Sequence, residues 1–453
     1  MLKKFSFPLI IALFATAILP AQQSPSPFQY VRFHACRQQD GIYTESEYTH
    51  FDKVKWKLDA GGKIFSSPAV LDGTVYAGSE DHYLYAADLK TGKLRWKFKT
   101  GGAVHSSPSV FNHTVYIGSF DGYYYAVDAG TGKEKWRVKT GGEKWMGGIG
   151  YFGMKPVDQY LEDPWDFFLS SVVPDPDDQG RTIYFGSSDG NLYAVNAEDG
   201  TIRWKFRTDG PIHTTPAVMH QTVYVGSWDA NFYAIDSKTG QLKWKVRTGD
   251  KPGMTGIQSS AVVDGDNVYF GARDAHVYCL SAATGEVVWT YDAEGSWILS
   301  SPTIKDHVLY VGTSDSYLLL AIDAQTGREK FRFKTHGYVY SSPSLAGNTA
   351  YFGDFTGALF ALDLSSEGKC WDEFALESRK KNAALVLKDD HMDFMLAASG
   401  KDVSVYANTV EVMNKFYALG PVVSSAYIYE GVLYVGSADG FLYAIELTGG
   451  KCD

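Results

Sequence analysis

One short module is repeated along this chain, and the repeat limits the fold more than any other feature of the sequence. The stretch YAGSEDHYLYAADLKTGKLRW begins at Tyr76, and close copies begin at Tyr116, Tyr184 and Tyr224. A module that recurs at a fixed period of about 40 residues is typical of repeat architectures, because a single unit cannot bury its own apolar face. One closed array is therefore a simpler account of these 453 residues than the two or three domains that length alone suggests.

Each unit contains four short segments with the pattern of β-strands. In the first unit they are FSSPAV from Phe65, GTVYAGS from Gly73, YLYAAD from Tyr83 and LRWKFKT from Leu94. Apolar residues alternate with polar ones, aromatic and β-branched residues are frequent, and Gly, Asp or Asn mark the junctions. The recurring DLKTG from Asp88 fits a tight hairpin in which glycine takes positive φ. The chain is thus predicted to be all-β.

The count of units predicts the architecture. Eight clear units begin near Phe65, His105, Leu169, His213, Gln258, Leu299, Tyr340 and Val423. About one more repeat length lies between the last two units, and we interpret residues 377–418 as a degenerate ninth repeat.

The two ends of the repeat array complement each other. The last unit lacks a fourth strand, whereas VKWKL from Val54 is a fourth strand without its first three. Joining the two removes an unpaired sheet edge. We therefore predict a single β-propeller over residues 54–453, with eight or nine four-stranded blades and a ring closed by an N-terminal strand.

The N-terminus predicts export. Lys3 and Lys4 precede an apolar run from Phe5 to Leu19, and the small Ala21 follows, so residues 1–21 fit a signal peptide cleaved near Ala21. The run is short for a membrane span, although an uncleaved anchor is the alternative. Residues 22–53 are then a lead-in to the propeller, and we expect a periplasmic or secreted protein with no membrane span in the mature chain.

The net charge of the chain bears on its binding partners, and its cysteine content bears on disulfide formation. The formal charge is -10, and loss of the two signal-peptide lysines takes it to -12, so nucleic acid is not an expected partner. In an oxidising compartment the four cysteines, Cys36, Cys279, Cys370 and Cys452, allow a disulfide. Cys36 with Cys452 is the pairing we favour, since both ends should meet, but the sequence leaves the pairing open.

The repeat resembles the pyrroloquinoline-quinone (PQQ) type of propeller repeat, whose consensus carries Ala-x-Asp-x-x-Thr-Gly-x-x-x-Trp. The resemblance covers about nine tenths of the mature chain and implies that the tryptophan docks between neighbouring blades. The tryptophans expected to have this structural role are Trp56, Trp96, Trp136, Trp204, Trp244 and Trp289. Phe331 replaces tryptophan in the sixth unit.

The resemblance leaves two functional classes. The family contains quinone-dependent dehydrogenases and non-enzymatic members such as the propeller lipoprotein that helps assemble outer-membrane barrels. The dehydrogenases carry a disulfide between adjacent cysteines and a calcium site, and no two cysteines of this chain are neighbours. We therefore expect a non-enzymatic binding or scaffold module for a protein or small ligand, without cofactor. The alternative is a PQQ- and calcium-dependent dehydrogenase with a divergent pocket.

No motif in the sequence predicts a catalytic or metal site. GSSDG from Gly186 has the spacing of a nucleophile elbow around Ser188, but it lies in a hairpin turn and not between a strand and a helix. DPDDQG from Asp175 begins like a calcium loop, yet Gly186 stands where a bidentate glutamate belongs. The eleven histidines show no zinc-like spacing with cysteine.

Variable positions within the regular units mark a candidate ligand-binding rim. In a four-stranded meander the start of the first strand and the end of the second lie on one face, so residues at these two places should converge around the channel mouth. The seven candidates are His105, His213, Tyr340, Phe120, Trp228, Arg273 and Phe355. The alternative is that these are unconstrained turn residues.

The one large insertion, residues 143–169, should lie on the same face, since it joins a fourth strand to the next first strand. It carries seven aromatic side chains, more than a simple connection needs. It either plugs the channel or presents an apolar contact patch, and we favour the plug.

Overall fold

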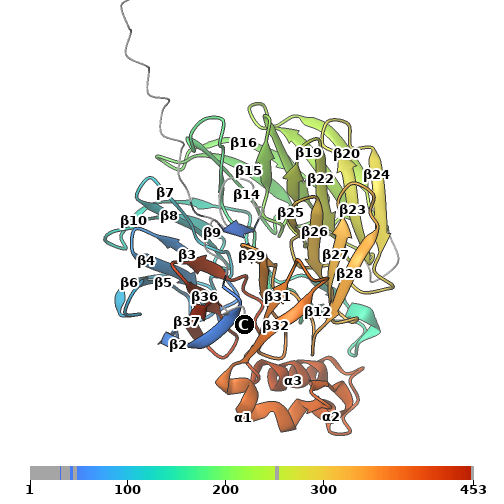
Figure 1. The fold of residues 1–453 in the computed structure, drawn as a ribbon. Helices are drawn as coiled ribbons and strands as arrows, with labels where there is room; N and C mark the ends of the chain where they lie inside the picture. The colour runs from blue at the N-terminus through green and yellow to red at the C-terminus, as the bar shows by residue number, and fades with distance from the viewer. Residues whose placement is uncertain (1–30, 32–40, 44–47, 250–254, 450–453) are drawn as a thin grey trace, which may run out of the picture.

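The chain forms a single eight-bladed β-propeller in the computed structural model (Figure 1). The structure describes residues 31, 41–43, 48–249 and 255–449. The predicted signal peptide, Cys36, Cys452 and most of the predicted lead-in lie outside these residues. Among the described residues Cys279 and Cys370 are free thiols.

Every blade is a four-stranded antiparallel meander with its first strand next to the channel. Blade one comprises β3 (Ala69–Leu71), β4 (Thr74–Gly78), β5 (Tyr83–Asp88) and β6 (Leu94–Lys99), and blade two comprises β7 (Ser109–Phe111), β8 (Thr114–Ser119), β9 (Tyr123–Asp128) and β10 (Glu134–Lys139). Blade three comprises β13 (Val173–Pro174), β14 (Thr182–Gly186), β15 (Asn191–Asn196) and β16 (Ile202–Arg207). Blade four comprises β17 (Ala217–Met219), β18 (Thr222–Gly226), β19 (Asn231–Asp236) and β20 (Leu242–Arg247). Blade five comprises β21 (Val262–Asp264), β22 (Asn267–Gly271), β23 (His276–Ser281) and β24 (Val287–Asp292). Blade six comprises β25 (Thr303–Lys305), β26 (Val308–Gly312), β27 (Leu318–Asp323) and β28 (Glu329–Lys334). Blade seven comprises β29 (Ser344–Ala346), β30 (Thr349–Gly353), β31 (Ala358–Asp363) and β32 (Lys369–Ala375).

The eighth blade closes the ring as the strand count predicted. Its first three strands are β35 (Tyr427–Tyr429), β36 (Val432–Gly436) and β37 (Phe441–Thr448), and the fourth is the N-terminal β2 (His50–Asp59). Trp56 lies opposite Ala444 in this antiparallel pair. A second N-terminal strand, β1 (Ile42–Tyr43), pairs in parallel with β29 and adds a fifth strand to blade seven.

The predicted degenerate ninth repeat is wrong, because residues 377–418 form helices. They contain α1 (Glu377–Val386), α2 (Phe394–Ala398) and α3 (Tyr406–Tyr417), with a short hairpin of β33 (Leu387–Lys388) and β34 (His391–Met392). The first helix reads ESRKKNAALV, which is rich in strong helix formers and lacks a Thr-Gly turn and a docking tryptophan. Figure 1 shows the three helices together, beyond β31 and β32. We call residues 377–418 the helical segment.

A tryptophan near the end of each of six blades docks onto the next blade. Each indole Nε1 donates to the carbonyl oxygen that follows the third strand of the neighbour: Trp56 to Leu89, Trp96 to Ala129, Trp136 to Ala197, Trp204 to Ser237, Trp244 to Ala282 and Trp289 to Ala324. The ring lies against the turn glycine of that blade. A Cβ on Gly132, for example, would come within 2.7 Å of the Trp96 ring, and its φ of +69° also favours glycine.

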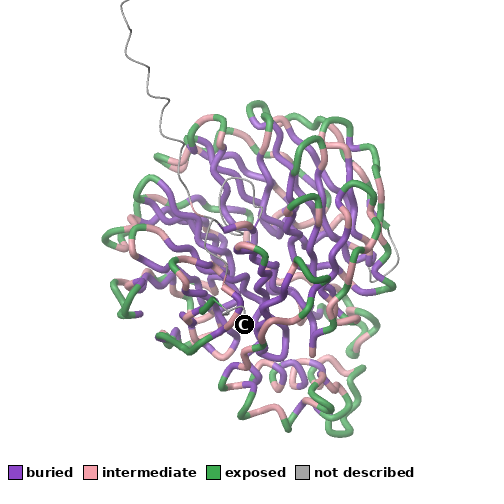
Figure 2. Tube along the Cα trace, in the orientation of Figure 1, coloured by how far each residue is buried: buried purple, intermediate pink, exposed green. Residues whose placement is uncertain are grey.

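Burial follows the distance from the channel (Figure 2). The second and third strands are buried almost throughout, whereas the fourth strands alternate between exposed and half-buried residues, as in β6. Charged side chains on these outer strands protect the edges from pairing with other chains.

Candidate functional site

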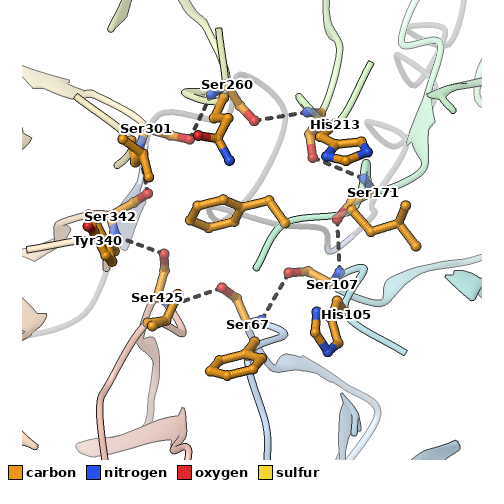
Figure 3. Close-up of a pocket in the computed structure, with 17 residues that line it drawn as sticks. Ser67, His105, Ser107, Ser171, His213, Ser260, Ser301, Tyr340, Ser342 and Ser425 are labelled. Carbon is orange, nitrogen blue, oxygen red and sulfur yellow. Dashed lines mark hydrogen bonds between the residues drawn. The ribbon is translucent and has the colours of Figure 1, made fainter. Parts of the chain in front are cut away.

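A closed ring of hydroxyl side chains lines the channel (Figure 3). One serine or threonine near the start of each blade accepts a hydrogen bond from the backbone N–H of the equivalent residue in the preceding blade. The eight members are Ser67, Ser107, Ser171, Thr215, Ser260, Ser301, Ser342 and Ser425. The bond that closes the circle runs from the Ser425 N–H to Ser67 Oγ at 2.8 Å. The recurring Ser-Ser-Pro of the sequence therefore ties neighbouring blades together at the axis.

The channel itself is nearly full. Phe168 and Leu169 of the insertion lie among the ring residues, and the remaining cavity measures about 30 Å³. That space is close to the volume of one water molecule in the liquid and far below the several hundred Å³ of a typical ligand pocket.

The insertion, residues 143–169, covers the mouth of the channel. It contains β11 (Gly147–Ile149) paired with β12 (Tyr160–Glu162), and the short 3₁₀ helix η1 (Tyr151–Gly153). Phe167 lies at the centre, with ring centroids 5.1 Å from Phe65, 5.8 Å from Tyr340 and 5.7 Å from Phe355. We call residues 143–169 the plug, since they fill the mouth as well as span it.

The helical segment covers the plug from outside. Tyr417 of α3 packs against Phe167 with 6.3 Å between ring centroids, and Val412, Met413 and Phe416 join the same buried cluster. Backbone hydrogen bonds connect the two segments: Lys155 N–H donates to the Ser404 carbonyl at 2.8 Å.

Buried polar contacts hold the plug on the rim. His105 Nδ1 lies 2.9 Å from the carbonyl oxygen of Phe167. His213 Nδ1 lies 3.1 Å from Asp166 Oδ1, and Gln258 Nε2 donates to the same oxygen at 3.0 Å. Burial lowers the pKa of His213, but the Asp166 carboxylate more than offsets this and raises it.

Arg273 makes the strongest of these contacts. Its guanidinium donates to Asp163 Oδ2 at 2.5 Å and to the Tyr151 hydroxyl at 2.9 Å. It lies between two indoles, 4.5 Å from the ring centroid of Trp228 and 4.1 Å from that of Trp297. Burial lowers the pKa of Arg273, but Asp163 and Tyr151 more than offset this, so the side chain remains charged.

The seven predicted rim residues do lie around the channel mouth, but the protein's own plug covers them. Five are buried, namely His105, His213, Arg273, Tyr340 and Phe355. Phe120 and Trp228 are half-buried, and Phe120 stacks on Trp145 of the plug at 4.5 Å and 11°. The expected open rim is therefore a set of contacts within the chain, because the plug and the helical segment supply the apolar surface that a ligand would otherwise provide.

Three residues of this network have the spacing of a serine hydrolase triad. Ser188 Oγ lies 2.8 Å from His213 Nε2, and Asp166 lies on the other side of the imidazole. Ser188 is only 4% exposed, and its hydroxyl also donates to the Lys144 carbonyl of the plug at 3.2 Å. A nucleophile needs access to its substrate, so this triad serves to hold the plug.

A pocket remains open at the edge of the plug. Its lining residues are Phe152, Met154 and Trp165 of the plug and Trp297, Asp315, Tyr338 and Tyr340 of the blades, around a cavity of about 270 Å³. We call it the plug-edge pocket. The sequence prediction did not include Trp297, Asp315 or Tyr338, although Asp315 directly follows Ser314, which is the equivalent in blade six of the rim positions Phe120 and Trp228.

Exposed apolar side chains gather on the plug and the helical segment. Of the fourteen large hydrophobic residues that are exposed in the described part of the chain, eight belong to these two segments: Ile149, Phe152, Val157, Tyr160, Leu385, Met395, Leu396 and Val403. Ile149 is 70% exposed and Met395 is 73% exposed. We call these eight residues the apolar face.

His336 connects the helical segment to blade seven. Its Nε2 lies 3.1 Å from the Glu373 carboxylate on β32, and its Nδ1 lies 3.4 Å from Asp390. The hydrogen bond with Glu373 raises the pKa of His336 above its ordinary value, more than burial lowers it. The three side chains form ion pairs, and Asp390 also pairs with Arg379 at 2.6 Å.

The channel does not fit a quinone cofactor. A tricyclic quinone needs a slot between flat groups near the axis, whereas Phe168 and Leu169 leave about 30 Å³ there. Within the described residues the two cysteines, Cys279 on β23 and Cys370 on β32, belong to different blades. We therefore derive no dehydrogenase chemistry from this site.

Two family models match the sequence. The model described as the β-propeller of the beta-alanine-activating enzyme matches residues 170–447, which is more than half of the chain. The model of the outer membrane protein assembly factor BamB matches residues 50–150. The search of curated proteins found no match to this chain.

Solved structures share the fold at low sequence identity. BamB from Moraxella catarrhalis is 15% identical with a TM-score of 0.62, over 87% of this chain and 99% of that protein. A europium-containing methanol dehydrogenase is 14% identical with a TM-score of 0.65, over 93% and 99%. The quinohemoprotein alcohol dehydrogenase of Comamonas testosteroni is 14% identical with a TM-score of 0.60, over 88% and 77%. Such identities establish the fold alone, and the similar structures include an outer membrane protein assembly factor as well as dehydrogenases.

Proposed function

The chain belongs to the family of β-propellers described for the beta-alanine-activating enzyme, and its repeats are of the PQQ type. From this premise we propose that it is an exported, non-enzymatic module that binds a protein partner. The observation that carries the proposal is the apolar face. A monomeric soluble protein rarely gathers exposed apolar side chains in one region unless that region makes a contact.

The construction of the face supports a binding role. The six other exposed large hydrophobic residues of the described chain lie one or two to a strand on β2 and on outer blade strands, whereas the eight of the apolar face lie on two segments that interrupt the repeat. The plug is fixed to the propeller by the buried Arg273–Asp163 pair, so the four residues of the face that belong to the plug are held on a rigid base. A rigid, pre-formed surface loses less conformational entropy when a partner binds.

The comparisons support a protein as the partner and export as the setting. BamB is an assembly factor for outer membrane proteins by name, and its family model matches the first blades of this chain. The basic and apolar N-terminal sequence supports export in the same way. No helix of the described residues has the length and apolar character required to cross a bilayer.

The alternative function is that of a PQQ-dependent dehydrogenase. The similarity of the fold to dehydrogenase structures supports it, whereas the small cavity left in the channel argues against it. Adding pyrroloquinoline quinone and Ca²⁺ to the purified protein and recording the absorption spectrum with dye-linked alcohol oxidation separates the two. We expect neither stoichiometric binding nor turnover.

The direct test uses the apolar face. Partners are cross-linked to the protein in its native cell envelope and compared between the wild type and the variant I149S/V157S/M395S. The control variant L94S/L242S removes exposed apolar residues of β6 and β20, outside the face. We expect the face variant to lose a cross-linked protein that the control variant keeps. Equal cross-linking in both variants would contradict the proposal.

A further inference from the structure

The plug-edge pocket has the chemistry of a receptor for an organic cation, and we propose that it binds a small ligand with an alkylated ammonium group. This is a second activity, distinct from the docking of a protein on the apolar face, although Phe152 belongs to both surfaces. The argument uses the size of the pocket, its aromatic walls and one carboxylate.

The pocket has the volume of a small-molecule site. Its cavity of about 270 Å³ lies just below the usual range for ligand pockets and can hold a trimethylammonium group with a short chain. It lies between the plug and blades six and seven, so both fixed blade residues and the plug form its walls.

Five aromatic residues surround this space. Phe152 of η1 lies nearly parallel to Trp297, with 5.8 Å between ring centroids and 16° between planes. Tyr338 stacks on Tyr340 at 5.3 Å, and Trp165 of the plug completes the lining. The negative faces of aromatic rings attract cations, and such cages are the usual receptors for quaternary ammonium groups.

The protein already uses one of these rings to hold a cation. The Arg273 guanidinium lies 4.1 Å from the centroid of Trp297. Its charge is neutralised by Asp163 at 2.5 Å, so it does not balance any further negative charge in the pocket. A second cation in the pocket would therefore not face an unpaired positive charge.

Asp315 supplies a negative charge that has no ion-pair partner among the described residues. A chain of hydrogen bonds fixes it next to Trp297, because the Trp297 N–H donates to Ser314 Oγ at 2.9 Å and the Ser314 hydroxyl donates to Asp315 Oδ2 at 2.7 Å. Asp315 itself is exposed. The nearby Lys334 donates to the Ser316 carbonyl at 2.6 Å and lies over the Tyr317 ring, so it is engaged elsewhere.

This combination distinguishes a cation from other ligands. A neutral apolar ligand would gain from the rings but not from the carboxylate, and an anion would be repelled by Asp315 and by the ring faces. Burial, and then the charge of Asp315, raise the pKa of Tyr338, which agrees with a negative potential at this place.

The experiment compares choline with its neutral isostere 3,3-dimethylbutan-1-ol, by NMR titration of each ligand against the full protein. We expect saturable binding of choline and roughly tenfold weaker binding of the alcohol. The variant D315N should weaken choline binding about tenfold while leaving the alcohol unchanged, and F152A should weaken both.

A matched control uses D306N, an exposed aspartate of the same blade in the β25–β26 turn, away from the pocket. It should bind choline as the wild type does. The proposal is wrong if choline shows no saturable binding, if the alcohol binds as tightly as choline, or if D315N and D306N bind alike. Phe152 and Asp315 are both exposed, so their variants should fold normally.

Discussion

Replacing Arg273 with methionine should release the plug from the channel mouth. Arg273 is 1% exposed, and its partner Asp163 is also buried. A distance of 2.5 Å separates Arg273 Nη2 from Asp163 Oδ2. Methionine keeps most of the apolar length of the side chain between Trp228 and Trp297, but leaves a carboxylate in the interior without its cation. Breaking a buried ion pair in this way costs about 3–5 kcal/mol, and most of that cost is the unpaired charge.

The double variant separates charge from packing. In R273M/D163N no charge is left unpaired, so we expect a clearly smaller loss than in R273M, even though the contacts of the guanidinium with the two indoles are gone. The Asp163 carboxylate also accepts the Trp165 N–H at 2.9 Å, which an asparagine oxygen can still accept. The difference between the two variants measures the cost of the buried charge.

Urea unfolding and limited proteolysis provide the assay. Unfolding midpoints report global stability, and cleavage sites within residues 143–169 report release of the plug. The control is R332M, which breaks the Arg332–Glu329 pair at 2.6 Å on a side chain that is 41% exposed, where we expect a loss below about 1 kcal/mol. If R273M were no more destabilised or protease-sensitive than R332M, the plug would not depend on this ion pair. If R273M/D163N lost as much as R273M, packing and not charge would explain the effect.

Two more predictions concern the contacts between blades and around the helical segment. W136F should cost about 0.5–1.5 kcal/mol, measured by urea unfolding, because it removes the 3.1 Å hydrogen bond to the Ala197 carbonyl but keeps a ring against the turn glycine. A loss of several kcal/mol would mean that indole packing, not the hydrogen bond, makes the junction. His336 has a raised pKa in the folded state, so its contribution to stability is fully present below the unfolded pKa of about 6.5 and is lost as pH rises through the folded pKa. The difference in unfolding free energy between wild type and H336Q should therefore shrink from pH 6 to pH 9, and a constant difference would contradict the role of the charged imidazole.

The repeat by itself determines the propeller and its closure. Each unit carries its own strands and turns, and the patterns behind them are local: alternation in Tyr83–Asp88, for example, and glycine in the turn that follows. The missing fourth strand of the last unit and the surplus strand at Val54 could be paired by counting alone. Strand counting works because a sheet edge that lacks a partner must find one.

The ninth repeat shows where this counting fails. Residues 377–418 have about the length of a unit, and from Ala383 they align loosely with one, which together favour a ninth blade. Their composition favours helix, and neither a Thr-Gly turn nor a docking tryptophan is present, and these signals outweigh the length. A repeat is specified by its contacts with neighbours, and this segment lacks the residues that make them.

Register along the repeat brings the seven rim residues together around the channel mouth, since equivalent positions of equivalent blades must converge on the axis. The sequence alone did not determine what covers them. His213 meets Asp166 across 47 residues, and Arg273 meets Asp163 across 110, through a plug without repeat symmetry. Periodicity predicts what is repeated. The covered rim and the plug-edge pocket depend on single contacts between distant segments, and those were decided only when the chain packed in three dimensions.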